Sequence, residues 1–293
     1  MAVDTILFGD CRKTLNNLHN QLTIGIAERP RMCVTSPPYY GLRNYGGEED
    51  QIGLEQTPEE YVDELVKVFR LVRNCLTEDG TCWVNIGDSY YNYRPGKGQA
   101  LSKQSFSNTK QDLPDTCARR GNKLEGLKEK DLIGIPWMFA FAMRADGWYL
   151  RQDIVWNKPN PMPESVKDRC TKSHEYIFLF SKSQNYYFDV DSIKEPTVDG
   201  KGLKRKKSVW SVPNKSYKEA HFATYPPDLI EPCILAGSQE RDIILDPFMG
   251  SGTTALVAKS LQRYYIGCEL HEEYGKLIQK RLSGKSFARI KFQ

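Results

Sequence analysis

Two short stretches of the sequence combine residue types that could hold a ligand and act on it. The first is TSPPY at residues 35–39, where Ser36 precedes two prolines and Tyr39. It follows the apolar run RMCV and therefore stands where a strand would end. Because Pro37 and Pro38 have fixed φ angles, the corner would hold its polar atoms in one geometry. Taken alone, however, the stretch fits a structural turn with a packed tyrosine better than a catalytic site.

The second stretch is DPFMGSGTT at residues 246–254, after an apolar run typical of a strand. Gly250 and Gly252 would let the backbone turn tightly and approach a ligand. The next apolar run ends at Glu269, 23 residues after Asp246, a spacing at which a carboxylate can bind a ribose diol. Because the third glycine of the dinucleotide fingerprint is absent, we expect a nucleoside-type cofactor without a pyrophosphate.

The chain around these stretches alternates between apolar runs and amphipathic segments. A helix is predicted over 61–76, with Thr57 as its cap, Pro58 in its first turn and Glu60 completing a capping box. Thr253 is expected to cap the helix that follows the glycine motif. Further helices are predicted over 132–147, 253–262 and 272–282, and strands over 5–10, 31–36, 81–88, 149–158, 175–183, 241–248 and 263–270. This alternation favours an α/β fold with a mostly parallel sheet flanked by helices.

Two long stretches interrupt the alternation. Residues 92–126 are polar and without a period, and so is the stretch around 190–215. The second contains KGLKRKK at 201–207, which places five cations in seven residues of a chain whose net charge is +4. Such segments are either solvated or disordered loops, or surfaces that bind a polyanion such as DNA.

The composition argues against several classes of protein. Of the 293 residues, 40% are hydrophobic, and no apolar run reaches the length of about 18 residues that a membrane span needs. The N-terminus lacks a basic leader followed by an apolar core, so we expect a cytosolic protein. The eight cysteines form no C-x-x-C pair and the four histidines are scattered, which predicts buried free thiols and no metal site.

Together, TSPPY and DPFMGSGTT resemble the two signature motifs of the amino-group DNA methyltransferases, which use S-adenosylmethionine and modify N4 of cytosine or N6 of adenine. The motif order, with the glycine motif near the C-terminus, resembles the β arrangement of that family. The resemblance implies a circularly permuted Rossmann-like methyltransferase fold. Its catalytic half would comprise 1–91 and 127–189, and its cofactor-binding half 216–293. Residues 92–126 and 190–215 would be inserts that contact the target DNA.

The resemblance also assigns site residues. Asp10 matches an acidic position near the adenine of the cofactor, and His221 and Thr224 match a segment at its methionine end. The remaining cofactor residues would come from the glycine motif and the strand after it: Asp246, Phe248, Gly250, Gly252, Thr253 and Glu269. The catalytic residues would be Ser36, Pro37, Pro38 and Tyr39.

The chemistry gives these catalytic residues distinct tasks. A base amine is inaccessible inside a duplex, so the target base must be flipped out. Tyr39 would stack on the flipped base, while the Ser36 hydroxyl and the Pro37 carbonyl would accept the two N–H groups of its amine. No covalent intermediate is required. Within the family, a serine at the first motif position is associated mostly with N4 of cytosine.

We therefore expect cytosine N4 to be the target, with adenine N6 as the first alternative. A nucleic-acid-binding protein with an inactive cofactor pocket and a small-molecule methyltransferase are the alternatives from other classes. Double-stranded DNA is the expected substrate and a cognate restriction endonuclease is a candidate partner. The sequence leaves the recognition site and the oligomeric state open.

Overall fold

The structure, a computed structural model, describes residues 3–41, 51–91, 124–214 and 225–283. Its strands are β1 (Thr5–Phe8), β2 (Met32–Thr35), β3 (Thr81–Ile86), β4 (Tyr149–Asn157), β5 (His174–Ser181), β6 (Glu195–Pro196), β7 (Leu203–Lys204), β8 (Val209–Ser211), β9 (Ile243–Asp246) and β10 (Tyr264–Glu269). Its helices are α1 (Cys11–Thr23), α2 (Pro58–Cys75), α3 (Ile135–Ala145), α4 (Pro227–Gly237), α5 (Thr253–Ser260) and α6 (Glu273–Ser283).

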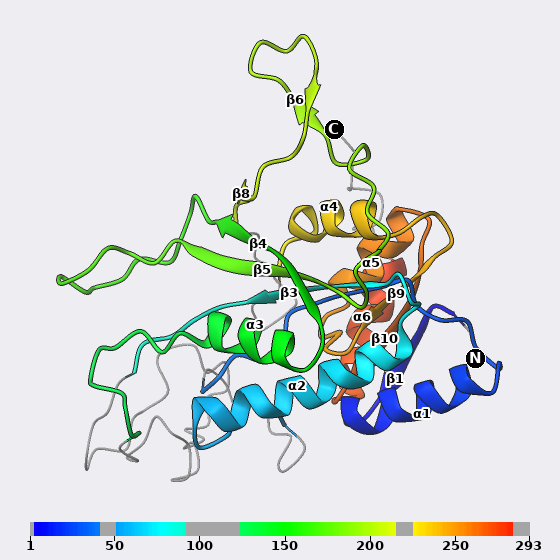
Figure 1. Cartoon of the computed structure of the whole chain (residues 1–293), viewed down its shortest axis with the longest axis horizontal. Helices are drawn as coiled ribbons and strands as arrows, with labels where there is room; N and C mark the ends of the chain where they lie inside the picture. Colours follow the sequence, from blue (N-terminus) through cyan, green and yellow to red (C-terminus); the bar gives the residue numbers. More distant parts are fainter. Residues whose placement is uncertain (1–2, 42–50, 92–123, 215–224, 284–293) are drawn as a thin grey trace.

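A mixed, mostly parallel sheet forms the centre of the molecule (Figure 1). Its strand order is β1-β10-β9-β2-β3-β5-β4-β8. The first five strands in this order are parallel to one another, and β5 is antiparallel to both of its neighbours. Strand β2, from the N-terminal part of the chain, pairs with β9 from the C-terminal part. The predicted fold class is confirmed, including the circular permutation.

Helices cover both faces of this sheet (Figure 1). Successive side chains of a strand point to opposite faces, so Cys33 of β2 joins one core and Val34 joins the other. The first core lies against α1, α2 and α3, and the second against α4, α5 and α6. Residues that represent the two cores are Leu18, Phe69 and Phe139 in the first, and Ile230, Ala255 and Ile278 in the second.

The start of α2 follows the sequence prediction closely. The hydroxyl of Thr57 accepts a hydrogen bond from the backbone N–H of Glu60 at 3.1 Å. The carboxylate of Glu60 in turn accepts one from the backbone N–H of Thr57 at 3.1 Å. The capping box is therefore confirmed, and Pro58 occupies the first turn as expected.

Two helices escaped the sequence analysis. In α1, buried Leu15, Leu18 and Leu22 have helical spacing, but they alternate with polar residues of modest helix propensity. In α4, Pro232 lies inside the helix, where a proline normally argues against helical structure. Both helices are stabilised by burial against the sheet rather than by strong local propensity.

The stretch around 190–215 is more regular than predicted. Strands β6 and β7 form a two-stranded antiparallel hairpin that projects from the body, and β8 pairs with β4 at the edge of the central sheet (Figure 1). Residues 92–123 of the other predicted insert lie outside the described residues. Among the helices of the described part, none is long and apolar enough to cross a membrane.

Candidate active site

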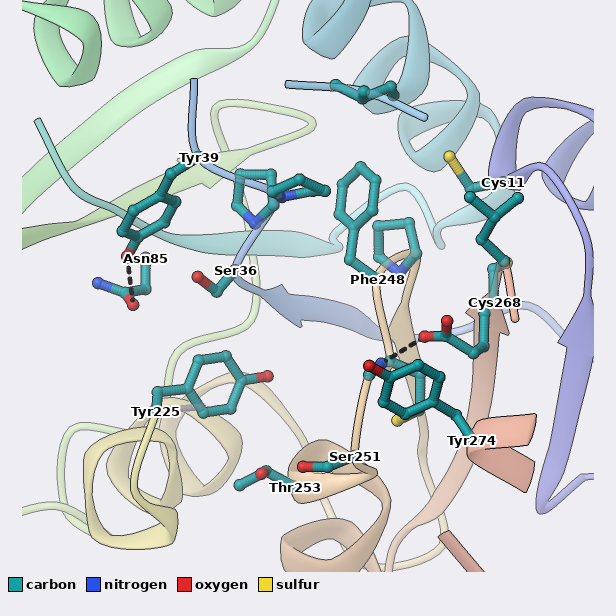
Figure 2. A pocket seen from close by; sticks show the side chains of 18 of the residues that line it. Cys11, Ser36, Tyr39, Asn85, Tyr225, Phe248, Ser251, Thr253, Cys268 and Tyr274 are labelled. Atoms are coloured by element: carbon teal, nitrogen blue, oxygen red, sulfur yellow. Dashed lines mark hydrogen bonds between the residues drawn. The ribbon is translucent and has the colours of Figure 1, made fainter. Parts of the chain in front are cut away.

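A cavity of about 250 Å³ lies where β2 and β9 end, and both sequence motifs line it (Figure 2). The ends meet because the two strands are adjacent and parallel, with Cys33 opposite Leu245. The chain after β2 supplies one wall of the cavity, and the chain after β9 supplies the facing wall. Side chains from these two stretches point toward the same space, including Ser36 and Phe248 (Figure 2).

The proline corner forms what we call the acceptor wall. Ser36, Pro37, Pro38 and Tyr39 all line the cavity. The carbonyl of Pro38 accepts a hydrogen bond from the hydroxyl of Tyr61 on α2 at 2.7 Å, which fixes the corner from behind. Within the described residues, the Pro37 carbonyl has no hydrogen-bond partner, so it remains able to accept one from a ligand.

Tyr39 is held at several points. Its hydroxyl donates to Oε2 of Glu175 at 2.7 Å and is 3.3 Å from Oδ1 of Asn85. Its ring occupies the space beside Gly87, where a Cβ atom would lie 2.6 Å from ring carbon Cε2. Burial, followed by the negative charge of Glu175, raises the pKa of Tyr39 well above its usual value. Tyr39 is therefore a neutral, oriented phenol.

Three residues that the sequence analysis did not single out complete the acceptor wall. Glu175 at the start of β5 accepts a hydrogen bond from Nδ2 of Asn85 at 3.1 Å, and its other oxygen pairs with the ammonium of Lys158. Lys158 also lies over the ring of Trp156, 4.2 Å from its centroid. Asn85 lies on β3, Glu175 lies on β5 and Lys158 directly follows β4, so no local motif connects them. Only the charged pair at the ends of apolar runs could have drawn attention.

The glycine loop forms the cofactor wall opposite. Gly250 donates its backbone N–H to Oε2 of Glu269 at 2.8 Å, and His271 donates its backbone N–H to Oε1 at 3.0 Å. Glu269 therefore stands at the end of β10 with both oxygens oriented by backbone donors. Burial raises its pKa despite these donors. Asp10, which caps α1 and pairs with Arg12, lies on the same cavity.

Asp246 lies behind the cavity wall, with an exposed fraction of 1%. Its Oδ1 accepts hydrogen bonds from the Thr35 hydroxyl at 2.5 Å and the Phe248 N–H at 3.0 Å. Its Oδ2 accepts from the Thr254 hydroxyl at 2.5 Å and the Tyr225 hydroxyl at 3.2 Å. Burial is the main influence on its pKa and raises it. One carboxylate thus connects the acceptor corner, the glycine loop and α5.

Two buried polar atoms on the cavity have no partner in the described part of the protein: Oγ1 of Thr253 and Nε2 of His271. A buried polar atom without a hydrogen bond is costly, so these atoms fit a ligand that carries polar groups. The prediction that Thr253 caps α5 is wrong. Gly252, in the left-handed conformation at φ 80°, occupies the cap position, and Thr253 is the first helical residue.

Comparisons with known proteins show which family the chain belongs to. Residues 31–280 match the family model N6_N4_Mtase, described as a DNA methylase. The chain belongs to this N6/N4 DNA methylase family. The methylase is 51% identical over 256 residues to the type II methyltransferase M.XycI of Xanthomonas campestris pv. cyanopsidis, covering 87% of this chain and 82% of that protein. It is 46% identical over 278 residues to M.SmaI of Serratia marcescens, covering 94% and 90%.

Solved methylase structures share the fold. A cytosine-N4-specific PvuII DNA methyltransferase aligns with a TM-score of 0.66 at 19% identity, covering 97% of this chain and 88% of that one. A Thermus thermophilus protein, solved as a complex with S-adenosyl-L-methionine, aligns with a TM-score of 0.60 at 22% identity, covering 99% of this chain and 96% of that one. The predicted family and its cofactor, S-adenosylmethionine, are confirmed.

Most of the predicted site residues of this methylase converge on the one cavity. Asp246 and Gly252 do not line it directly, and His221 and Thr224 lie outside the described residues. Their neighbour Tyr225, which the sequence analysis passed over, does line it. The predicted residues that line the cavity are Asp10, Ser36, Pro37, Pro38, Tyr39, Phe248, Gly250, Thr253 and Glu269. No group of three or more metal-ligating side chains occurs in the described ranges.

Proposed function

We propose that this protein transfers a methyl group from S-adenosylmethionine to the exocyclic N4 of a cytosine flipped out of double-stranded DNA at a specific sequence. One observation carries the proposal: the Ser36 corner and the glycine loop line a single cavity. A bond between Thr35, which precedes the corner, and Asp246, which precedes the loop, fixes the two walls relative to each other.

The residues of the acceptor wall have the donors and acceptors that this reaction needs. Bound S-adenosylmethionine supplies a methyl group on a positively charged sulfur, which a nitrogen lone pair can attack. The amine lone pair is delocalised into the base ring, so it must be turned toward the methyl group. The Ser36 hydroxyl and the Pro37 carbonyl do this by accepting the two N–H groups, and the fixed prolines keep both acceptors preorganised.

The cofactor wall offers polar groups that suit S-adenosylmethionine. Glu269 suits the ribose hydroxyls, because its carboxylate lies at the end of β10 beside the glycine loop. Thr253 and His271 provide buried polar atoms that still lack a partner in the described structure. Asp10 and Phe248 complete this wall, and we place His221 and Thr224 at the methionine end, as the family motif implies.

The choice of cytosine rests on Ser36. In the family that the motif resembles, serine at this position accompanies cytosine N4 more often than adenine N6. The relatives at 46–51% identity are named type II methyltransferases, which supports a protective role beside a cognate restriction endonuclease.

We place DNA contacts on the β6–β7 hairpin. It carries the basic run, and only part of that run is neutralised locally: Lys204 and Lys206 lie 3.8 and 3.9 Å from the carboxylate of Glu195. Lys201 and Arg205 are exposed and have no ion pair within the described residues. Exposed cations on a projecting hairpin suit the phosphates of a duplex.

The product of the reaction tests the proposal. The protein is expressed in a host without DNA methyltransferases, and the DNA is digested to nucleosides and analysed by mass spectrometry. We expect N4-methylcytosine, and its absence when Ser36→Ala is expressed at the same level. N6-methyladenine alone would contradict the base assignment. If the wild type yields neither methylated nucleoside, the result would support the alternative of a DNA-binding protein that does not methylate.

A further inference from the structure

Lys158 is a cationic residue of the acceptor wall that has no task in the reaction described above. It directly follows β4, and it is the only lysine or arginine among the described residues that line the cavity. Its ammonium pairs with Glu175, and only 17% of the Lys158 side chain and 15% of the Glu175 side chain are exposed. An ion pair so withdrawn from water adds little net stability, because both charges lose their hydration. Its place on the cavity therefore indicates a function toward a ligand.

Apart from Ser36, whose hydroxyl binds the amine in the proposed reaction, the other side chains of the acceptor wall have no donor left for a ligand. The hydroxyl of Tyr39 has a single proton, which it donates to Oε2 of Glu175 at 2.7 Å. The two N–H groups of the Asn85 amide donate to Oε2 of Glu175 and to the carbonyl of Tyr176, each at 3.1 Å. A carboxylate such as that of Glu175 only accepts hydrogen bonds.

The ammonium of Lys158 differs from these groups because it keeps donors in reserve. An ammonium has three N–H donors and no acceptor. One donor serves Glu175, which within the described residues is the only hydrogen-bond partner of this ammonium. The charge also lies over the ring of Trp156, 4.2 Å from its centroid, and this contact helps to fix its position. Lys158 therefore has an oriented N–H group available to a molecule in the cavity.

A flipped cytosine presents a donor and an acceptor side by side on its Watson–Crick edge, and enzymes that flip a base read this edge by hydrogen bonds. The exocyclic amine is the donor, and the ring nitrogen N3 beside it carries a lone pair and no hydrogen. Ser36 and Pro37 match the amine but provide nothing for N3, whereas an ammonium matches it. Thymine and guanine have an N–H at the corresponding ring position, which cannot accept a hydrogen bond from an ammonium.

We propose that Lys158 donates a hydrogen bond to N3 of the flipped cytosine and so restricts the reaction to bases with an acceptor beside the amine. This inference deepens the proposed methyl transfer and rests on it. Glu175 holds the ammonium close to the acceptor corner, because its other oxygen binds the hydroxyl of Tyr39. Lys158 is therefore only two bonded contacts away from the residue that stacks on the base. The same ammonium would match N1 of adenine, so the choice between the two bases stays with Ser36.

The test combines a change in the protein with a change of one atom in the DNA. In 3-deaza-2′-deoxycytidine a C–H group replaces N3, while the amine and the carbonyl oxygen are kept. Duplexes with cytosine or this analogue at the target position are compared in single-turnover reactions. Lys158→Met keeps the length of the side chain but cannot donate. Its preference for cytosine over the analogue should be roughly 30-fold smaller than that of the wild type, the effect of one hydrogen bond to a charged group. An equal preference in both proteins would overturn the proposal.

Further variants separate this contact from indirect effects. Lys158→Met leaves Glu175 without its cation, so the double variant with Glu175→Gln removes both charges and should show the same reduced preference. Glu175→Gln alone keeps the ammonium as a donor and should retain most of the preference. Lys182→Met is the matched control, because this side chain is 15% exposed, pairs with Glu78 and follows the opposite end of β5 from Glu175.

Two measurements distinguish the base from other anionic or polar ligands of Lys158. A loss of S-adenosylmethionine affinity in Lys158→Met would assign the ammonium to the carboxylate of the cofactor. A salt slope of DNA binding lower by about 0.9, with the preference for cytosine intact, would assign it to a phosphate. Either result would overturn the proposal.

The contact can also be tested separately from the methyl transfer. DNA affinities measured with S-adenosylhomocysteine give the same comparison of substrates without a reaction. A wild type that does not methylate would contradict the proposed function, while these affinities still test the contact. If the product is N6-methyladenine, the analogue is 1-deaza-2′-deoxyadenosine, which lacks the corresponding ring nitrogen.

Discussion

The two walls of the cavity are built in different ways. On the cofactor wall, the carboxylate of Glu269 is held by backbone N–H groups, and Asp246 behind the wall is held by hydroxyls and one backbone N–H. On the acceptor wall, Glu175 is held by side chains alone, one of them the ammonium of Lys158. The cofactor wall is thus a product of local backbone shape, and the acceptor wall is a product of the tertiary fold.

This difference has a functional reason. A cofactor is the same in every turnover, so a loop with a rigid backbone conformation can bind it with little reorganisation. The target base arrives with a large DNA partner and must be gripped, methylated and released. We expect a change in one wall to leave the ligand bound by the other wall unaffected.

The largest expected effect comes from Gly252, which gives the cofactor wall its shape. A valine there would adopt a left-handed conformation at φ 80° and place its Cβ 3.0 Å from Cγ2 of Ile278. Gly252→Val should weaken S-adenosylmethionine binding on the order of 100-fold, measured by calorimetry. Gly200→Val is the control: its φ is 68°, and its added Cβ would meet nothing within 4 Å. Equal affinities of the two variants for S-adenosylmethionine would contradict the idea that the backbone conformation at Gly252 shapes the cofactor wall.

The contrast between the walls also explains what could be predicted from the sequence. The glycine loop and Glu269 were predictable because a turn, a helix and a strand follow one another within a short stretch, and their spacing is visible. The same holds for the capping box of α2. Glu175, Lys158 and Asn85 were not predictable because they meet only when β5 enters the sheet antiparallel between β3 and β4. The structural function of Asp246 was not predictable either. A carboxylate at the end of a strand is typical of a ligand-binding residue, but the hydrogen bonds of Asp246 are made with other groups of the protein.

On the acceptor wall, Gly87 is the equivalent weak point. An alanine at this position would place its Cβ 2.6 Å from the Tyr39 ring and push the ring out of place. Gly87→Ala should slow methyl transfer by roughly 30-fold, because a small misplacement of a positioning residue is costly. The affinity for S-adenosylmethionine should not change. The control is Gly202→Ala, whose added Cβ would have no neighbour closer than 3.9 Å. A matching loss of cofactor affinity in Gly87→Ala would show that the walls are not separable.

Asp246 lies between the walls and accepts hydrogen bonds from hydroxyl groups on both sides. Removing these hydroxyl groups one at a time distinguishes its contribution to the acceptor wall from its contribution to the cofactor wall. Thr35→Val removes the bond to the strand that carries Ser36, and Thr254→Val removes the bond to α5. A hydrogen bond to a charged group contributes about 1.5–3 kcal/mol, so each loss should be about tenfold or more. We expect Thr35→Val to lower the single-turnover rate and Thr254→Val to lower cofactor affinity. Identical phenotypes would mean that Asp246 acts only on the stability of the whole domain.

The β6–β7 hairpin belongs to neither wall, so a change there should leave both intact. Arg205→Ala should weaken DNA binding severalfold and reduce the slope of log affinity against log salt by about 0.9, the value for one phosphate contact. Lys67→Ala on α2 serves as the control. The measurement is a DNA titration at several salt concentrations. If the salt dependence of DNA affinity in Arg205→Ala equals that of the wild type, Arg205 does not contact a phosphate, which would contradict the placement of the hairpin at the DNA interface.

The smallest effect is a pH dependence that only the buried carboxylates should show. Burial raises the pKa of Asp246, so the folded protein binds this proton more tightly than the unfolded chain does. Its contribution to stability is therefore greatest at low pH and declines as the pH rises above about 3.9, the value for an unperturbed aspartate. Asp246→Asn cannot titrate, so the stability lost in this variant should be larger at pH 4 than at pH 7.

Urea unfolding of both proteins at the two pH values measures this difference. Surface carboxylates titrate alike in wild type and variant, so their contributions cancel in the comparison. If the four donors around Asp246 favoured the ionised form more than burial opposes it, the loss would instead grow with pH. That outcome would make Asp246 a permanently charged residue between the walls, held by neutral donors alone, whereas Glu175 of the acceptor wall pairs with the ammonium of Lys158.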